Sequence, residues 1–264
     1  MLITLLTDFG TADYFVGAMK GVILSINREA RIVDLTHEIP PQDIEAGAFN
    51  LLAVYESFPA ETIHVAVVDP GVGSKRRPIL VSGGNQFFVG PDNGLFSYIY
   101  ERERDARVFH LTNAQYFRPS VSATFHGRDV FAPVAGALTL GVRPEQLGDE
   151  ITDYVRLPQL VPRLSAGKDL VASIIHIDRF GNCLTNLTPE HLTEAMIAAG
   201  AGLTINGRKI TTFRRFFAEE SSAPGELFAI WGSAGYLEIA AYRASAAQLL
   251  GARRGQLITV TSDK

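Results

Sequence analysis

Three short apolar segments, each ending in a polar turn, constrain the possible folds of this 264-residue chain most strongly. Residues 63–68 form a β-branched and nearly all-apolar run, which predicts a strand buried on both faces. Residues 2–6 and 31–35 predict two more strands. Apolar residues at helical spacing follow each of these two strands, within residues 14–25 and 43–58. The order strand, helix, strand, helix, strand predicts a parallel sheet with right-handed crossovers.

The remaining elements divide the chain into two parts. In the first part we expect strands at 79–81, 86–89 and 107–111 and helices at 95–100 and 130–140. Prolines and a small-residue triplet predict a linker at 157–168. Beyond it, short strands are predicted at 170–177, 203–205, 208–210, 227–230, 236–240 and 256–260, with one helix at 189–199. The expected fold is an α/β N-terminal domain with a mainly parallel sheet, residues 1–160, followed by a smaller, mainly antiparallel, barrel-like β domain, residues 169–264.

The composition excludes several classes of function. A formal charge of −4 provides no basic field for nucleic acid or an anionic membrane, and we expect the Arg214-Arg215 pair to be a solvated surface. The single cysteine, Cys183, cannot form an internal disulfide or a cysteine-based zinc site, and we expect it to be buried. No apolar run approaches membrane-spanning length, and the first residues lack the basic region of a signal peptide. We therefore expect a cytoplasmic protein with no nucleic-acid or membrane partner.

Polar groups at strand ends are the first candidates for chemistry. Asp69 follows the strand at 63–68 and precedes a loop with Gly71 and Gly73, and Arg76 comes seven residues after the aspartate. Open α/β sheets bind ligands at the carboxyl ends of their strands, so this carboxylate and this guanidinium could face one small pocket. A solvated turn with an ordinary surface salt bridge is an equally good interpretation at this point.

Other polar groups have the same ambiguity. Asp8 ends the first predicted strand, and His126 lies in the loop before the helix at 130–140. A turn cap and a satisfied core histidine are the respective alternatives. The turn at Asp178 and the loop at Ser233 also have plain structural interpretations. The sequence contains no phosphate-binding glycine loop, no nucleophile elbow and no two-histidine metal spacing, so we expect no metal site.

Seven motifs in a fixed order are more specific than any of these residues. They are TDFG, THEIPPQDIEAGAF, VVDPGVGSKRR, PDNG, ATFHGRD, IDRFGN and GSAGYLEIA. Spread over essentially the whole chain, they resemble the S-adenosyl-L-methionine (SAM) hydroxide adenosyltransferases, the SAM hydrolases that are related to fluorinase and chlorinase. The resemblance implies hydrolysis of SAM to adenosine and L-methionine, with SAM as the substrate and with neither cofactor nor metal.

The resemblance also implies roles for particular residues. The family's catalytic aspartate, arginine and histidine correspond to Asp69, Arg76 and His126, whereas the halogenases have a tyrosine in place of this aspartate and another residue in place of the histidine. The implied substrate-binding residues are Asp8, for the ribose, and Asn93, Phe125, Asp178, Asn182, Ser233, Tyr236, Ala241 and Arg243. Halogenases carry an arginine after the serine, where this chain has Ala234, so the group that holds the methionine carboxylate stays open.

The implied assembly is a homotrimer in which each site lies between the first domain of one subunit and the second domain of the next. We expect in-line attack of an activated water on the ribose 5′ carbon. Arg76 would orient the water, and either Asp69 or His126 would be the base. The alternatives are a non-catalytic protein that binds SAM or adenosine, a SAM-dependent halogenase and, more distantly, a metal-dependent hydrolase.

Overall fold

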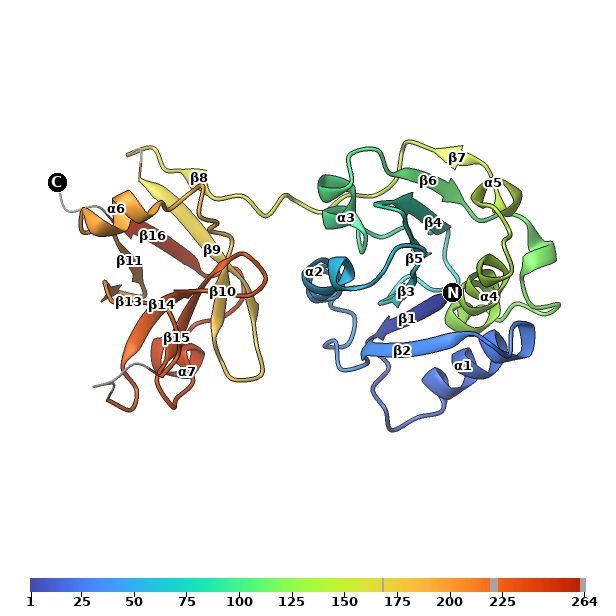
Figure 1. Ribbon diagram of the computed structural model, residues 1–264, viewed down its shortest axis with the longest axis horizontal. Helices are drawn as coiled ribbons and strands as arrows, with labels where there is room; N and C mark the ends of the chain where they lie inside the picture. Colours follow the sequence, from blue (N-terminus) through green and yellow to red (C-terminus); the bar gives the residue numbers. More distant parts are fainter. Residues whose placement is uncertain (168, 219–222, 262–264) are drawn as a thin grey trace. The chain divides into compact units, whose positions relative to one another are not determined.

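The computed structural model describes residues 1–167, 169–218 and 223–261. Within it the chain divides into two compact units, Met1–Pro158 and Gln159–Lys264 (Figure 1). Residue 168 of the predicted linker, and residues 219–222 and 262–264 of the predicted second domain, lie outside the described part. Among the residues that are described, no helix combines the length and the apolar character needed to cross a membrane.

The first unit is built on a seven-stranded sheet in the order β2-β1-β3-β5-β4-β6-β7. Its strands are β1 (Leu2–Thr7), β2 (Arg31–Thr36), β3 (Ile63–Val67), β4 (Pro78–Gly83), β5 (Gln86–Pro91), β6 (Arg107–His110) and β7 (Glu150–Ile151). β1 pairs in parallel with β2 and β3, and β3 pairs in parallel with β5. The pairings of β4 with β5, β4 with β6 and β6 with β7 are antiparallel.

The prediction of a mainly parallel sheet is thus only partly correct, because the sheet is mixed. Gly84 and Asn85 both have a φ of +58°, which closes a tight reversal between β4 and β5. Here the chain turns back on itself instead of crossing over through a helix, so β4 runs against its neighbours. The three strands of residues 2–68 are parallel, as their spacing predicts.

Helices cover both faces of this sheet. They are α1 (Phe15–Ile26), α2 (Ile44–Val54), α3 (Ser97–Arg102), α4 (Ala132–Thr139) and α5 (Pro144–Leu147), with 3-10 turns η1 (Tyr55–Ser57) and η2 (Ala114–Tyr116) and a π-helical turn η3 (Gly127–Phe131). α1 packs against α4 and η3, and α2 packs against α3. Figure 1 shows the two groups on opposite sides of the sheet. Asp43 caps α2 by accepting the N–H of Ala46 at 2.9 Å.

In the described residues of the second unit, nine strands form one sheet. They are β8 (Arg163–Leu164), β9 (Leu170–Ile177), β10 (Cys183–Thr185), β11 (Gly202–Ile205), β12 (Arg208–Ile210), β13 (Phe213–Arg214), β14 (Leu227–Trp231), β15 (Leu237–Ala241) and β16 (Leu257–Thr261). The order is β12-β11-β16-β9-β10-β15-β14-β13, with β8 beside β9. The β13–β14 pairing is parallel and the other pairings are antiparallel. The mainly antiparallel second part is therefore confirmed.

Two details of this unit differ from the expectation. The helix expected at 189–199 is the shorter α6 (Glu194–Ala198), because the Thr193 side chain accepts the N–H of Met196 and caps the helix there. Arg214 is not solvated: its side chain is buried, lies over the Phe228 ring and pairs with Glu226 at 2.8 Å. Cys183 is fully buried, as predicted.

Candidate functional site

The carboxyl ends of β1 and β3 meet at one edge of the first sheet, because these two strands are parallel neighbours. Asp8 directly follows β1, and Asp69 comes two residues after β3. Both aspartates line a cavity of about 440 Å³, whose other lining residues are Phe9, Phe15, Pro41, Gln42, Pro70 and Val72. This is the edge of an α/β sheet at which ligands bind.

Asp69, Arg76 and His126 form one hydrogen-bonded group behind this cavity. Nε of Arg76 donates to Asp69 Oδ1 at 2.8 Å and to Oδ2 at 3.0 Å, and Nη2 also donates to Oδ2. Nη2 lies 2.8 Å from Nδ1 of His126. The Arg76 and Asp69 side chains are 8% and 5% exposed, so the pair is not a surface salt bridge. The interpretation as a solvated turn is therefore wrong.

The glycine loop brings Arg76 back onto Asp69 through short-range hydrogen bonds. The N–H of Val72 donates to the Asp69 carbonyl at 3.2 Å, and the N–H of Arg76 donates to Ser74 Oγ at 3.2 Å. Gly73, with a φ of +76°, lies so close to the 118–126 segment that a Cβ there would overlap the carbonyl oxygen of Ala123. Only glycine fits this approach without displacing either loop.

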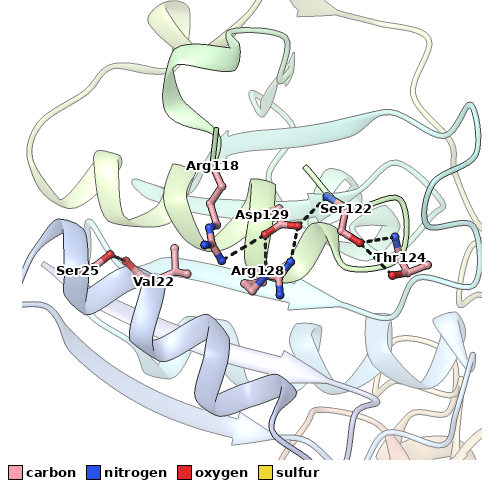
Figure 2. Close-up of polar contacts among 7 residues, drawn as sticks. All are labelled: Val22, Ser25, Arg118, Ser122, Thr124, Arg128 and Asp129. Atoms are coloured by element: carbon pink, nitrogen blue, oxygen red, sulfur yellow. Dashed lines mark hydrogen bonds and ion pairs between the residues drawn. The ribbon is translucent and has the colours of Figure 1, made fainter. Parts of the chain in front are cut away.

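His126 is positioned by a second loop that is fixed to a fully buried carboxylate. Asp129, 0% exposed, accepts the N–H of Ser122 at 2.8 Å and two N–H groups of Arg128 at 2.7 and 2.9 Å (Figure 2). Arg118 reaches the same carboxylate at 3.7 Å. These contacts tie both ends of the segment before η3 to its first turn. A π-helical turn is often found at functional sites, and η3 begins directly after His126.

The surroundings of His126 favour its neutral form. Burial lowers the pKa of His126, and the neighbouring Arg76 cation lowers it further. An arginine guanidinium can only donate hydrogen bonds, so Nδ1 of His126 must accept and cannot carry the proton. Nη1 of Arg76 is buried and has no hydrogen-bond partner among the described residues. It is therefore a donor available to a bound oxygen atom.

The other residues predicted in the first unit have varied positions. Asp8 lines the cavity, and its Oδ2 accepts the N–H of Gln42 at 2.8 Å. Asn93 donates from its side chain to the Val68 carbonyl at 2.8 Å and so holds the backbone next to Asp69. Phe125 is buried among aromatic rings and is not part of the cavity lining. The centroid of its ring lies 5.9 Å from that of Phe9 and 5.2 Å from that of Phe15. Its contact with a substrate stays a prediction.

The second unit has a larger cavity of about 1060 Å³. Five of the predicted substrate-binding residues line it, from the β9–β10 turn and from both sides of β15: Asp178, Asn182, Ser233, Ala241 and Arg243. Tyr236 is not part of the lining, and its carbonyl accepts the N–H of Gly232 at 2.9 Å. The structure thus brings these five predicted residues of the second unit together in one place.

Sequence reasoning missed several residues of this second cavity. They are Phe180, Arg215, Phe216, Phe217, Trp231 and Glu238. Three of these are phenylalanines with largely exposed side chains, which is unusual for such a residue. The arginine beside two of them favoured the interpretation as a solvated surface. A run of arginine and aromatic residues is also typical of a binding surface, so the sequence of Arg215, Phe216 and Phe217 is the signal from which this part of the cavity could have been predicted.

Both halves of the chain match one family. Residues 3–148 match the SAM hydroxide adenosyltransferase N-terminal domain, and residues 172–259 match the C-terminal domain of the same family. The chain belongs to this family. No group of three or more histidine, cysteine, aspartate or glutamate residues that could hold a metal ion occurs among the described residues of this adenosyltransferase-family chain, and its independence from metals stays a prediction.

Similar proteins carry two kinds of name. The chain is 37% identical to an (R)-S-adenosyl-L-methionine hydrolase of Methanocaldococcus jannaschii, over 94% of this chain and 91% of that protein. It is also 37% identical to the hydrolase of the same name from Thermus thermophilus, over 95% of each chain. A fluorinase of Nocardia brasiliensis is 25% identical over 98% of this chain and 96% of that protein. A crystal structure of a Thermotoga maritima protein superposes with a TM-score of 0.89 and 32% identity, over 98% of this chain and 99% of that one.

Proposed function

We propose that this protein is an enzyme that hydrolyses SAM to adenosine and L-methionine. The observation that carries the proposal is the hydrogen-bonded Asp69–Arg76–His126 group, with a buried Asp69–Arg76 pair, beside the cavity at the edge of the first sheet. The greater identity to proteins named hydrolases, 37% against 25% for the fluorinase, favours water over halide as the nucleophile. Simple binding of SAM would not need three charged or polar side chains in mutual contact.

The nucleophile, and not the leaving group, limits this reaction. A sulfonium leaves as a neutral thioether. Water ionises with a pKa of about 15.7, roughly nine units above neutrality, so free hydroxide would cost about 12 kcal/mol. We therefore propose that a positioned water attacks the ribose 5′ carbon in line with the departing sulfur and loses its proton as the carbon–oxygen bond forms. Correct placement of the water supplies a large part of the rate.

The hydrogen bonds distribute the roles. His126 uses Nδ1 to accept from Arg76, so its neutral ring carries the proton on Nε2 and can donate to an oxygen atom but not accept from one. Asp69 receives three hydrogen bonds from Arg76, which leaves about one of the four lone-pair positions of a carboxylate. Asp69 is therefore the base that we propose. The unpartnered Nη1 of Arg76 would hold the oxygen of the water or of the ribose.

The second cavity supports the further proposal that the enzyme works as a homotrimer. Each unit carries a cavity: Asp8 and Asp69 line the one in the first unit, and five of the predicted residues of the second half line the one in the second unit. In the proposed arrangement the ribose and the water would lie at the first cavity, and adenine and methionine at the second. We propose that a complete site takes the first unit of one subunit and the second unit of another, and that the enzyme acts in the cytoplasm without a metal.

Product analysis in ¹⁸O-labelled water tests the reaction. Incubation with SAM should release adenosine and methionine in equal amounts, and the 5′ oxygen of the adenosine should carry the label. Binding of SAM without release of adenosine would contradict hydrolysis and favour the binding protein. A halogenated adenosine formed in the presence of chloride or fluoride would identify a halogenase, and loss of activity in EDTA would contradict the metal-free mechanism.

A further inference from the structure

Glu238 is a buried acidic side chain in the wall of the second cavity. It lies on β15, and it is only 9% exposed. Its carboxylate lies directly over Gly232, so closely that a Cβ on this glycine would overlap Oε1. The position of the carboxylate beside the Gly232–Ser233 turn therefore depends on the absence of a side chain there.

The carboxylate of Glu238 has no hydrogen-bond or ion-pair partner among residues 1–167, 169–218 and 223–261. A carboxylate in a largely buried side chain is poorly stabilised when no donor faces it. Burial raises the pKa of Glu238, and the nearby Asp178 carboxylate raises it further. A cation in the cavity would remove both penalties.

Asp178, which lines the same cavity, is already occupied. Its Oδ1 accepts the N–H groups of Phe180 and Asn182 at 2.9 and 2.8 Å, and its Oδ2 accepts the side-chain amide of Asn182 at 2.9 Å. These bonds shape the β9–β10 turn. Of the two cavity carboxylates, Asp178 keeps about one open lone-pair position, whereas both oxygens of Glu238 are open to a ligand.

We propose that Glu238 binds the α-ammonium group of the methionine part of SAM and so distinguishes SAM from adenosine derivatives without an amino acid. The inference rests on the proposed function, because it takes SAM as the ligand. An ammonium supplies three N–H donors to a carboxylate that has none, whereas the sulfonium of SAM has no N–H group to donate. The ammonium is therefore the part of the substrate that suits this position.

The test compares Glu238→Gln with the wild-type enzyme on two substrates. One is SAM, and the other is the SAM analogue that lacks the α-amino group but keeps the sulfonium. Loss of a hydrogen-bonded charge pair should raise the KM for SAM roughly ten- to hundredfold. The KM for the deaminated analogue should be the same in both proteins, and the Kd for adenosine, measured by calorimetry, should not change. Glu190→Gln, an exposed residue of the same unit, is the matched control.

Three results would overturn the inference. They are an unchanged KM for SAM in Glu238→Gln, an equal rise in KM for the analogue, and an equal loss of adenosine affinity. If the wild-type protein does not hydrolyse SAM, the proposed function fails, and the same comparison is made on the Kd values of SAM and of the analogue. Melting temperatures check the fold of each variant. Glu238→Asp keeps the negative charge on a side chain that is one methylene group shorter. It should raise the KM for SAM by less than Glu238→Gln.

Discussion

Replacing Arg76 with lysine tests whether the guanidinium must bridge two groups. Arg76 contacts Asp69 and His126 through four hydrogen bonds, which come from Nε and Nη2. A lysine keeps the positive charge but has one nitrogen at the end of a flexible chain, so it cannot reproduce this fork. We expect the variant to keep one contact with Asp69 and to lose the bridge to His126.

The size of the effect follows from the lost contacts. At least two hydrogen bonds that involve a charged group disappear, each worth about 1.5 kcal/mol or more. A loss of about 3 kcal/mol in transition-state stabilisation lowers kcat/KM by about a hundredfold. Because the Arg76–Asp69 pair is buried, we also expect a lower melting temperature.

Arg77→Lys is the matched control for this substitution. Arg77 also makes four hydrogen bonds to two residues, Asp92 and Asp153, and neither of these residues lines the cavity. Arg77→Lys should lose less stability than Arg76→Lys, because the Arg77 side chain is 25% exposed and that of Asp153 is 77% exposed. Adenosine release, followed by chromatography at several SAM concentrations, should fall about a hundredfold only for Arg76→Lys. Equal losses of kcat/KM in both variants would refute the assigned role of Arg76.

Three further predictions follow from the loops around the site. Gly73→Ala should lower both kcat/KM and the melting temperature, because its Cβ would push away the carbonyl of Ala123; unchanged kinetics would show that the two loops need not touch. Asp129→Asn should lower kcat roughly tenfold with little change in KM. The Asp129 carboxylate accepts the N–H of Ser122 and affects the reaction only by positioning His126. A change confined to KM would contradict this role. Burial and a neighbouring cation lower the pKa of His126 below its ordinary value of 6.5. We therefore expect kcat/KM to be constant above pH 6.5 and to fall at more acidic pH, where Nδ1 becomes protonated. An acid limb with an apparent pKa above 6.5 would be inconsistent with the geometry.

The parts of the fold that sequence predicts well are those with local signals. The strands of residues 2–68 and the cap at Asp43 depend on residues within a few positions of one another. The direction of β4 depends on the turn at Gly84 and Asn85, which reverses the chain between two segments that are each recognisable as strands but whose relative direction no local signal gives. The length of α6 depends on one hydroxyl at Thr193, and its capping bond overrides the apolar pattern that precedes it.

The candidate site divides in the same way. Asp69 and Arg76 are seven residues apart, and the glycine loop between them is enough to suggest that they meet. His126 comes 50 residues after Arg76, so its place next to Nη2 could be expected only from the resemblance to a family. Glu238 carries no motif that marks it as a binding residue, because a glutamate on a short strand is ordinary. Its distinguishing property, burial without a donor, exists only in the folded chain.

Two glycines show why the motifs of this chain indicate where a site lies but not which atoms meet there. Gly73 leaves room for the carbonyl of Ala123, and Gly232 leaves room for the carboxylate of Glu238. In both cases the glycine matters because of a neighbour that approaches it, so a motif reveals that space is needed but not which atom fills it. Ala123 is 50 residues from its glycine and Glu238 is six. For that reason alanine at Gly73 should disturb the water-binding residues and alanine at Gly232 the binding of methionine, although each substitution adds the same single methyl group.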